Sequence, residues 1–245
     1  MSAASETPLL SALGIRKRFG ALPVLQDVDF TVGTGEAVGI VGPNGAGKTT
    51  LLNVLSGSLQ AGAGSVRFRD ADVTPASADQ RCRLGIARAH QVPKPFGGMT
   101  VFENVFVAAT AGGGKKRDDA YRSSTEALET CSMLDDANRR AETLGLLDRK
   151  RLELARALAT DPVVLLLDEI GSGLTDAEAE ELVETIRALL RRNIAIVWIE
   201  HIVHVLTQVV TRLVCMDAGR VIADGDPAAV MSDAAVIDAY LGSSA

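Results

Sequence analysis

A glycine-rich loop early in the chain has the residue types and spacing needed to bind a phosphate group. Residues 42–49 read Gly-Pro-Asn-Gly-Ala-Gly-Lys-Thr, directly after an apolar segment typical of a β-strand. Glycines at positions 45 and 47 let successive backbone N–H groups turn toward one anion without obstruction by a Cβ atom. Lys48 would supply a positive charge for the outer phosphates of a nucleotide, and Thr49 a hydroxyl for Mg²⁺. An ordinary glycine-rich turn is a weak alternative, because every residue of the pattern is present.

Two adjacent acids follow an apolar segment later in the chain. Residues 163–167 are entirely Val and Leu, and Asp168 and Glu169 come directly after them. Burying a lone carboxylate is costly, so two at the end of a strand suggest a cation and a polarised water nearby. Asp168 would hold Mg²⁺, directly or through water, and Glu169 would orient or deprotonate the attacking water. If the two acids occurred without other motifs, they would indicate a solvated strand end. Because the chain also contains a phosphate loop, we favour a catalytic role for them.

A histidine ends the next apolar segment in the same way. Residues 194–199 lead into Glu200 and His201. His201 could hydrogen-bond the terminal phosphate from the carboxyl edge of the sheet, where ligands of open α/β sheets gather. A lone histidine is more often structural, and that is our expectation for His204, in the first turn of a helix.

Strand and helix patterns alternate along the chain, which predicts an α/β fold with a mainly parallel sheet covered on both faces. Capping boxes begin helices at Thr100 and Thr175, and Gly57 would end the helix that follows the phosphate loop. We expect a flexible basic loop at 112–117 and a mostly helical insertion at about 90–147. The other expected elements are strands at 22–32, 36–41, 65–69, 163–167 and 194–199, and helices at 49–56, 119–134 and 148–159.

Length and charge restrict the function. The 245 residues suit one medium domain with a smaller inserted subdomain, and the net charge of −6 argues against general nucleic-acid binding. The apolar runs have strand length rather than the roughly 20 residues of a spanning helix. The first ten residues do not have the pattern of a secretory signal, and we expect a frayed tail at 1–8. Three scattered cysteines without metal-ligand spacing favour a reduced, cytosolic setting.

The motifs together resemble the ABC ATPases. They fall in the order of the Walker A, Q-loop, Walker B and H-loop motifs of that family, at Gly42–Thr50, Gln91, Leu165–Glu169 and His201, and the resemblance runs from residue 9 to 242. It implies a P-loop NTPase of the ABC type, with a mainly parallel core sheet, an antiparallel β-subdomain and a helical subdomain insertion.

More narrowly, the chain is similar to the larger ATPase subunit of branched-chain amino-acid importers. The matching segments are Arg18–Gly20, Pro95-Phe96, Met99–Val105, Ile199–His201 and the tail from Gly225-Asp-Pro227 to Ala239–Gly242, the most subfamily-specific piece. The resemblance implies a peripheral ATPase, with ATP and Mg²⁺, at the cytoplasmic face of the membrane. It would power import of branched-chain amino acids or a related small amide or acid. The implied partners are membrane permease subunits, a second ATPase subunit and, indirectly, a substrate-binding protein, without nucleic acid.

Further residue roles follow only from the resemblance. Phe19 would stack on adenine, although core packing is the default for a single Phe, and Gln91 would link Mg²⁺ and water to the helical subdomain, although it could be a plain loop amide. The implied metal ligands are Thr49, Gln91 and Asp168, with Glu169 and His201 catalytic. The implied nucleotide-binding residues are Phe19, Gly42, Asn44, Gly45, Ala46, Gly47, Lys48, Thr49 and Thr50.

Two places depart from the family pattern. The signature Leu-Ser-Gly-Gly-Gln, which closes over the partner's ATP in the family's head-to-tail dimers, is replaced here by Leu144, Gly145, Leu146, Leu147 and Asp148. Gly145 has no hydroxyl for the γ-phosphate, and Leu147 adds a side chain where a glycine lets the backbone approach. After Glu169, Ile170 replaces a proline, and Thr175 stands where aspartate is common, so we expect altered geometry there.

These departures leave a second hypothesis, a weakly catalytic regulatory subunit of a heterodimeric ABC transporter. A different ATPase partner is favoured, and a homodimer with two altered sites is the other arrangement. A soluble ABC ATPase of translation or DNA repair is disfavoured, because this short acidic chain has neither tandem domains nor long coiled coils. A lipopolysaccharide-export ATPase is similar, but the Tyr240-Leu-Gly242 ending favours an importer.

Overall fold

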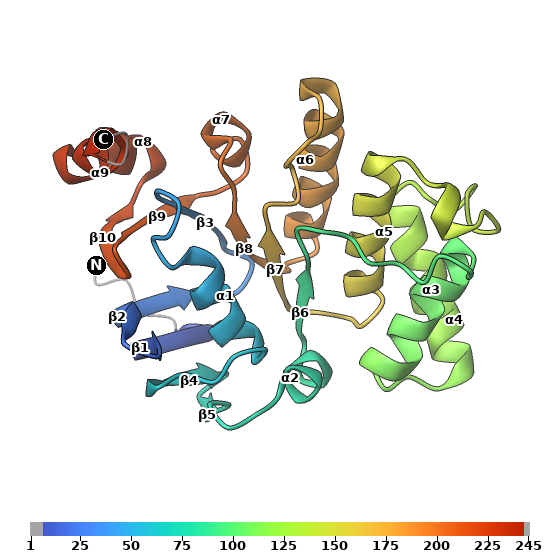
Figure 1. Cartoon of the computed structure of the whole chain (residues 1–245). Coiled ribbons are helices and arrows are strands. Elements are labelled where there is room, and N and C mark those ends of the chain that lie inside the picture. The colour runs from blue at the N-terminus through green and yellow to red at the C-terminus, as the bar shows by residue number, and fades with distance from the viewer. Residues whose placement is uncertain (1–6, 243–245) are drawn as a thin grey trace, which may run out of the picture.

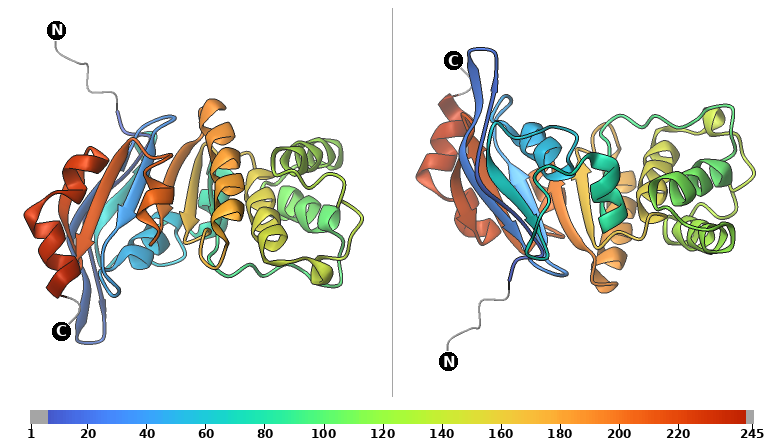
Figure 2. Two further views of the ribbon diagram at one scale, coloured as in Figure 1. Left: turned by 90° about the horizontal axis from the view of Figure 1, so that it is seen from above. Right: turned by 90° about the horizontal axis from the view of Figure 1, so that it is seen from below.

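The computed structural model describes residues 7–242, which form two β-sheets and an attached group of helices (Figure 1). The tail predicted at residues 1–8 falls largely on residues 1–6, outside the described residues. Figure 2 shows an elongated molecule: the last two helices lie at one end and the helices of the middle of the chain at the other. Among residues 7–242, no helix combines the length and apolar character needed to cross a membrane.

The larger sheet has six strands in the order β10-β9-β3-β8-β7-β6. Its neighbours pair in parallel except β9 and β10, which are antiparallel. The three strands β3, β7 and β8 are buried at every position, which explains their continuous apolar sequences. The strand bounds are β3 Ala37–Val41, β6 Ile86–Ala89, β7 Val164–Asp168, β8 Ala195–Ile199, β9 Arg212–Asp217 and β10 Arg220–Gly225.

A second sheet is antiparallel throughout, with the order β2-β1-β4-β5, so the expected antiparallel β-subdomain is present. Helix α1 (Lys48–Ser56) lies between the two sheets and ends at Gly57, whose φ of 78° is the left-handed conformation expected of a C-cap. The strands are β1 Leu10–Phe19, β2 Leu22–Val32, β4 Ala63–Phe68 and β5 Ala71–Asp72.

The helices of the middle of the chain form the subdomain at the right of Figure 1. Of the predicted helices, 119–134 is the least accurate: it begins at Arg117 and ends at Thr130, because Ser132 takes a positive φ of 55°. The basic loop is shorter than expected, and Lys115 pairs with Asp161. The elements are α2 Ala78–Leu84, α3 Val101–Val107, a π-helical turn Ala108–Gly112, α4 Arg117–Thr130, a 3₁₀ turn Ala141–Thr143 and α5 Leu146–Leu158.

Both predicted capping boxes are confirmed. The hydroxyl of Thr100 accepts a hydrogen bond from the N–H of Glu103, and that of Thr175 from the N–H of Glu178. They begin α3 and α6. The remaining helices are α6 Asp176–Arg191, α7 Val203–Leu206, α8 Pro227–Met231 and α9 Ala234–Gly242.

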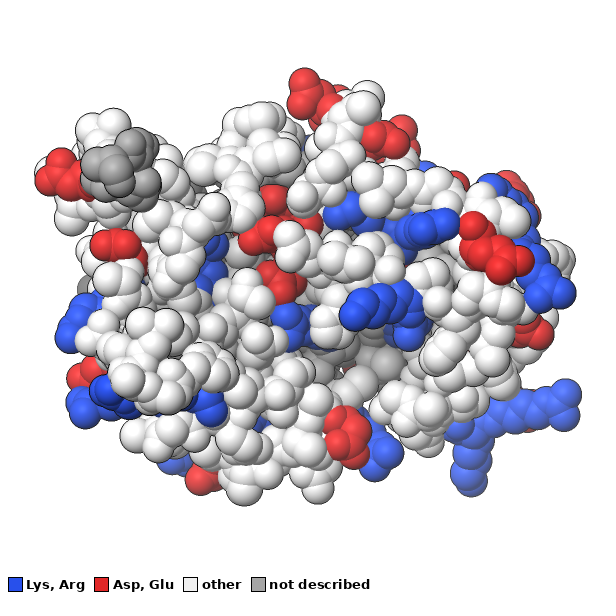
Figure 3. Space-filling view, viewed as in Figure 1, with Lys and Arg blue, Asp and Glu red and all other residues white. Residues whose placement is uncertain are grey.

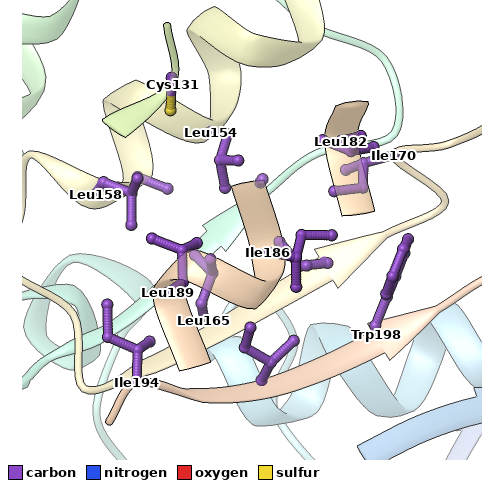
Figure 4. Close-up of a cluster of buried hydrophobic side chains, with 14 of the residues drawn as sticks. Cys131, Leu154, Leu158, Leu165, Ile170, Leu182, Ile186, Leu189, Ile194 and Trp198 are labelled. Carbon is purple, nitrogen blue, oxygen red and sulfur yellow. The ribbon is translucent and has the colours of Figure 1, made fainter. Parts of the chain in front are cut away.

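The large sheet divides the apolar interior into two clusters. Along β7, Leu165 and Leu167 face the cluster that contains α5 and α6, while Leu166 faces the cluster around α1 and the antiparallel sheet. In the first cluster, Leu182, Ile186 and Leu189 of α6 pack between the sheet and α5 (Figure 4). Two packed faces hold β7 rigidly, so the acids at its carboxyl end are held in place by the core.

Candidate nucleotide-binding site

The phosphate loop connects β3 to α1, and its backbone requires glycine. Gly42 and Gly47 have φ values of 139° and 101°, in the range that side chains disfavour. A Cβ atom on Gly42 would lie 2.0 Å from the carbonyl oxygen of Met216, and one on Gly47 would lie 2.8 Å from that of Val24. The loop therefore packs directly on the backbone of β9 and β2, and its shape is fixed before any anion binds.

The loop borders a cavity of about 190 Å³ that Asn44, Gly45, Ala46, Gly47, Lys48, Thr49, Thr50, Val24 and Glu169 line. Within the described part of the chain, no side chain caps the N-terminus of α1. The first N–H groups of that helix are therefore left to bind an anion.

Lys48 lies at the centre of this loop and is only 6% exposed. Its Nζ donates hydrogen bonds to the carbonyl oxygens of Gly42, at 2.7 Å, and Pro43, at 2.9 Å. Burial lowers the pKa of the ammonium group, while the negative charges of Glu169 and Asp168 raise it. A phosphate oxygen would offer this cation a charged partner in place of neutral carbonyls.

Asp168 ends β7 and is 3% exposed. Its Oδ2 lies 2.6 Å from Nη2 of Arg88, while Oδ1 faces the hydroxyl of Thr49 at 3.5 Å. Arg88 also donates to the side chain of Asn53 on α1. Our sequence interpretation missed Arg88, although an arginine within the otherwise apolar β6 was a signal. The pair leaves one carboxylate oxygen available beside Thr49.

The donor set beside Thr49 fits Mg²⁺ held jointly with a nucleotide. Among residues 7–242, no cluster of three His, Cys, Asp or Glu residues could hold a metal by itself. Mg²⁺ usually binds one or two protein oxygens, and phosphate oxygens and water complete its octahedron. Thr49 and Asp168 present that number of oxygens next to the phosphate loop.

Two polar side chains contact Glu169 beyond the phosphate loop. Its Oε1 lies 2.8 Å from Nε2 of His201, and its Oε2 accepts a hydrogen bond from the amide of Gln91. Its backbone N–H donates to the carbonyl oxygen of Ile199, and its φ of 48° is unusual for a residue with a side chain. The structure therefore brings Gln91, Glu169 and His201 together. The amide of Gln91 contacts Glu169, and its role toward Mg²⁺ stays a prediction.

A second buried acid lies beside this group. Glu200 is 1% exposed, and its carboxylate accepts hydrogen bonds from the backbone N–H groups of Gly171, at 2.6 Å, and His201, at 3.0 Å. Burial raises the pKa of Glu200. Our sequence interpretation noted Glu200 only as the neighbour of His201; an acid directly after an apolar strand, as at Asp168, was the signal.

Phe19 ends β1 and is 51% exposed, so the alternative of core packing is wrong. The ammonium of Lys17 lies 5.6 Å from the centre of the ring. The exposed face suits stacking by a flat ligand, and its role toward adenine stays a prediction.

The altered signature lies at the start of α5, which begins at Leu146, two residues before the predicted start. Leu144 is buried, and Gly145 is the N-cap of the helix, with no side chain to cap it. Leu146 is exposed, and the carboxylate of Asp148 lies 3.7 Å from Arg151. Leu146, Leu147 and Asp148 are thus the first turn of the helix.

The second departure has a structural explanation. Thr175 caps α6 with its hydroxyl, a task that an aspartate performs equally well. Ile170 is 2% exposed and packs with Leu182 of α6 (Figure 4). Both residues therefore serve the packing and start of this helix.

A tyrosine from α9 also reaches the phosphate loop. The hydroxyl of Tyr240 accepts a hydrogen bond from the N–H of Gly42 at 2.9 Å, and burial raises the pKa of Tyr240. Our sequence interpretation used Tyr240 only as a subfamily marker and did not predict this contact.

The charges around the site are of mixed sign. In Figure 3, acidic side chains gather near the centre of the face, over the carboxyl ends of the parallel strands, with basic side chains between them and the helical subdomain. Among the described residues, basic and acidic side chains therefore both lie on this face.

Comparison with known proteins identifies the family. Residues 25–172 match the family model for ABC transporters, and residues 220–245 match the model for branched-chain amino acid ATP-binding cassette transporters. The chain belongs to the ABC transporter ATP-binding family. Like other ABC cassettes it is an ATPase that binds ATP with Mg²⁺, and the glycine loop, Thr49 and Asp168 fit both ligands.

Several ABC relatives match this chain over nearly its full length. It is 36% identical to the high-affinity branched-chain amino acid transport ATP-binding protein LivG of Escherichia coli, over 96% of this chain and 98% of LivG. It is 32% identical to the corresponding protein BraF of Pseudomonas aeruginosa, with the same coverage.

Solved ABC cassettes have the same fold. A nucleotide-free ATP-binding cassette from an ABC transporter aligns with a TM-score of 0.87 and 28% identity, over 96% of this chain and 99% of that one. A cassette in its ADP conformation gives the same score and identity, over 97% and 100%.

Proposed function

We propose that this chain is the ATP-hydrolysing motor subunit of an ABC importer for branched-chain amino acids or a related small amide or acid. The observation that carries the proposal is the convergence of Gln91 and His201 on Glu169, beside an intact phosphate loop. The names of LivG and BraF and the match of the tail to a branched-chain family model support the cargo class.

The roles of the site residues follow from their positions. Lys48 and the N-terminus of α1 bind the phosphates, and Thr49 and Asp168 hold Mg²⁺, which neutralises developing phosphate charge when bound. Glu169 orients and deprotonates the attacking water, and His201 positions Glu169 and contacts the terminal phosphate. Phe19 stacks on adenine.

A groove beside the site suits a membrane partner. Two adjoining cavities of about 310 and 430 Å³ share His90, Glu153 and Arg156. Beside them, Val92 and Phe96 are 63% and 47% exposed, and the guanidinium of Arg156 lies 5.5 Å from the ring of Phe96. An apolar rim around a half-buried ion pair, here Arg156 with Glu153, can receive a short helix with a polar tip.

We place permease subunits in this groove, with the chain at the cytoplasmic face of the membrane and a binding protein delivering cargo from the other side. Gln91 touches Glu169 and adjoins the second cavity, so a movement of the permease would reach the catalytic group through one side chain.

The test is the substitution Glu169→Gln, which keeps the shape and removes the negative charge. We expect Mg·ATP to bind with unchanged affinity while steady-state turnover falls at least 100-fold, within the range that general-base catalysis contributes. Glu129→Gln, on the exposed face of α4, is the matched control and should retain activity. Full turnover by the Glu169→Gln variant would rule out this assignment.

The altered signature supports a second candidate, a regulatory subunit that pairs with a different ATPase. Gly145 brings no hydroxyl to the N-terminus of α5, so the partner's ATP would be held less well, while ATP on this chain's own loop would meet the partner's signature. ATPase rates of this chain alone and mixed with its natural partner separate the two candidates. Strong activity alone supports a homodimer, and activity only in the mixture supports the heterodimer.

A further inference from the structure

Glu200 is buried between the two loops that carry the catalytic groups, yet no step of the proposed reaction uses it. It follows β8, immediately before His201, and one carboxylate oxygen accepts from the N–H of Gly171 while the other accepts from the N–H of His201. Gly171 is two residues beyond Glu169. One side chain therefore joins the loop that carries Glu169 to the loop that carries His201.

The fit around this carboxylate is close. A Cβ atom added to Gly171 would lie 2.6 Å from Oε1 of Glu200 and 3.3 Å from its Cδ. A glycine is needed there only because the carboxylate lies against the backbone. The Glu200 carboxylate can therefore pack against the backbone of residue 171 only because that residue has no side chain.

Charges from two other elements face Glu200. Burial raises the pKa of Glu200 most, and the hydrogen bonds from Gly171 and His201 lower it. The negative charge of Glu169 raises it further, and the positive charge of Lys150 on α5 lowers it. Lys150 is itself 4% exposed, and burial lowers its pKa, while the negative charges of Glu200 and Glu169 raise it. The helix that carries the altered signature therefore contributes a buried cation that interacts with both acids.

We infer that Glu200 is a positioning residue. By accepting hydrogen bonds from the loops of both Glu169 and His201, it holds these two side chains in their catalytic positions. The inference deepens the proposed function and rests on it. The hydrogen bonds described for Glu200 go to Gly171 and His201 rather than to the phosphate loop, so its loss should affect the chemical step and leave nucleotide binding intact. A misplacement of about 1 Å in a catalytic group costs on the order of 100-fold in rate.

The experiment compares Glu200→Gln and Glu200→Ala with the wild type, with Glu129→Gln as the control. We expect kcat to fall 10- to 100-fold in Glu200→Ala, while the dissociation constant for Mg·ATP changes less than twofold. Glu200→Gln keeps the shape and one acceptor oxygen but presents an NH₂ group to the other N–H. Its kcat should therefore lie between that of the wild type and that of Glu200→Ala.

Gly171→Ala tests the contact from the other side. Alone it should lower kcat, because the new methyl group meets the carboxylate; added to Glu200→Ala it should cost little more, because the space is then open. Additive losses in the double variant would overturn the inference, as would a wild-type kcat in Glu200→Ala.

Thermal unfolding and the affinity for Mg·ATP distinguish a variant that fails to fold from one in which Glu169 and His201 are misplaced. If the Glu200 variants lose kcat only in proportion to their folded fraction, the inference fails. If Glu169→Gln is inactive while both Glu200 variants match the wild type, the inference fails and the proposed function stands. Wild-type turnover that does not depend on Glu169 would instead refute the proposed function.

Discussion

Gly145→Ser restores the hydroxyl that the altered signature lacks, and the structure allows it without strain. Gly145 has φ −67° and ψ 178°, which any residue adopts, and a Cβ atom placed there meets no described atom within 4 Å. Serine is a good N-cap, and replacing glycine with it there gains only a few tenths of a kcal/mol of helix stability. The fold should therefore be unchanged.

The gain in catalysis should be larger than the gain in stability. One hydrogen bond to a charged group contributes about 1.5–3 kcal/mol, and each 1.4 kcal/mol is tenfold in rate, so the site facing Gly145 should speed up roughly 10- to 150-fold. Leu147 remains in the variant and would bring the effect toward the lower figure.

The assay is steady-state ATPase activity at several protein concentrations, for the chain alone and with its partner. Gly145→Ala adds a Cβ without a hydroxyl and should give no gain. Lys116→Ser places a serine at the uncapped N-terminus of α4, away from the site, and controls for helix capping. Equal rates for Gly145→Ser and Gly145→Ala, in both settings, would refute the reasoning.

Three further predictions concern buried groups. Arg81 is 1% exposed and donates to the carbonyl oxygens of Val54 and Leu55 at the end of α1, so Arg81→Met should lower the free energy of unfolding by roughly 2–6 kcal/mol. Urea titration measures this, and a change below 1 kcal/mol would contradict it. Tyr240→Phe leaves the N–H of Gly42 without its acceptor, at a cost of about 1 kcal/mol, and should weaken Mg·ATP binding about fivefold by calorimetry; unchanged affinity would show that the bond is incidental. Burial raises the pKa of Cys131 to about 12, so between pH 9 and 11 the native thiol keeps a proton that the unfolded chain loses. Stability should therefore fall with rising pH, by up to about 1.4 kcal/mol per unit, and fall less steeply in Cys131→Ala; parallel curves would exclude this cause.

The sequence predicted well what local chemistry determines. The phosphate loop, the two capping boxes and the strands β3, β7 and β8 depend on residues within a few positions of one another, and each was found within two residues. Helix α4 ended too late in the prediction because Cys131 continues the helical spacing of the buried Ala127 and Leu128, while Ser132 turns the chain with a positive φ.

Contacts between distant segments were the ones missed. Arg88 meets Asp168 across 80 residues, and Tyr240 meets Gly42 across 198. Each side chain is ambiguous in its own segment, since an arginine in a strand or a tyrosine in a tail can serve many purposes. Only the order of the strands in the sheet, which periodicity does not determine, brings these partners together.

The order of strands also has a consequence for synthesis. Strand β3 leads into the phosphate loop, yet both of its neighbours, β8 and β9, are encoded far downstream. Roughly 150 residues separate Val41 from Ala195, and ribosomes add about 5–20 residues per second, so this apolar strand waits roughly 8–30 s for its first hydrogen-bonding neighbour. During that interval the nascent chain presents an open apolar edge, and chaperones that bind such edges should associate with it until β9 has left the ribosome.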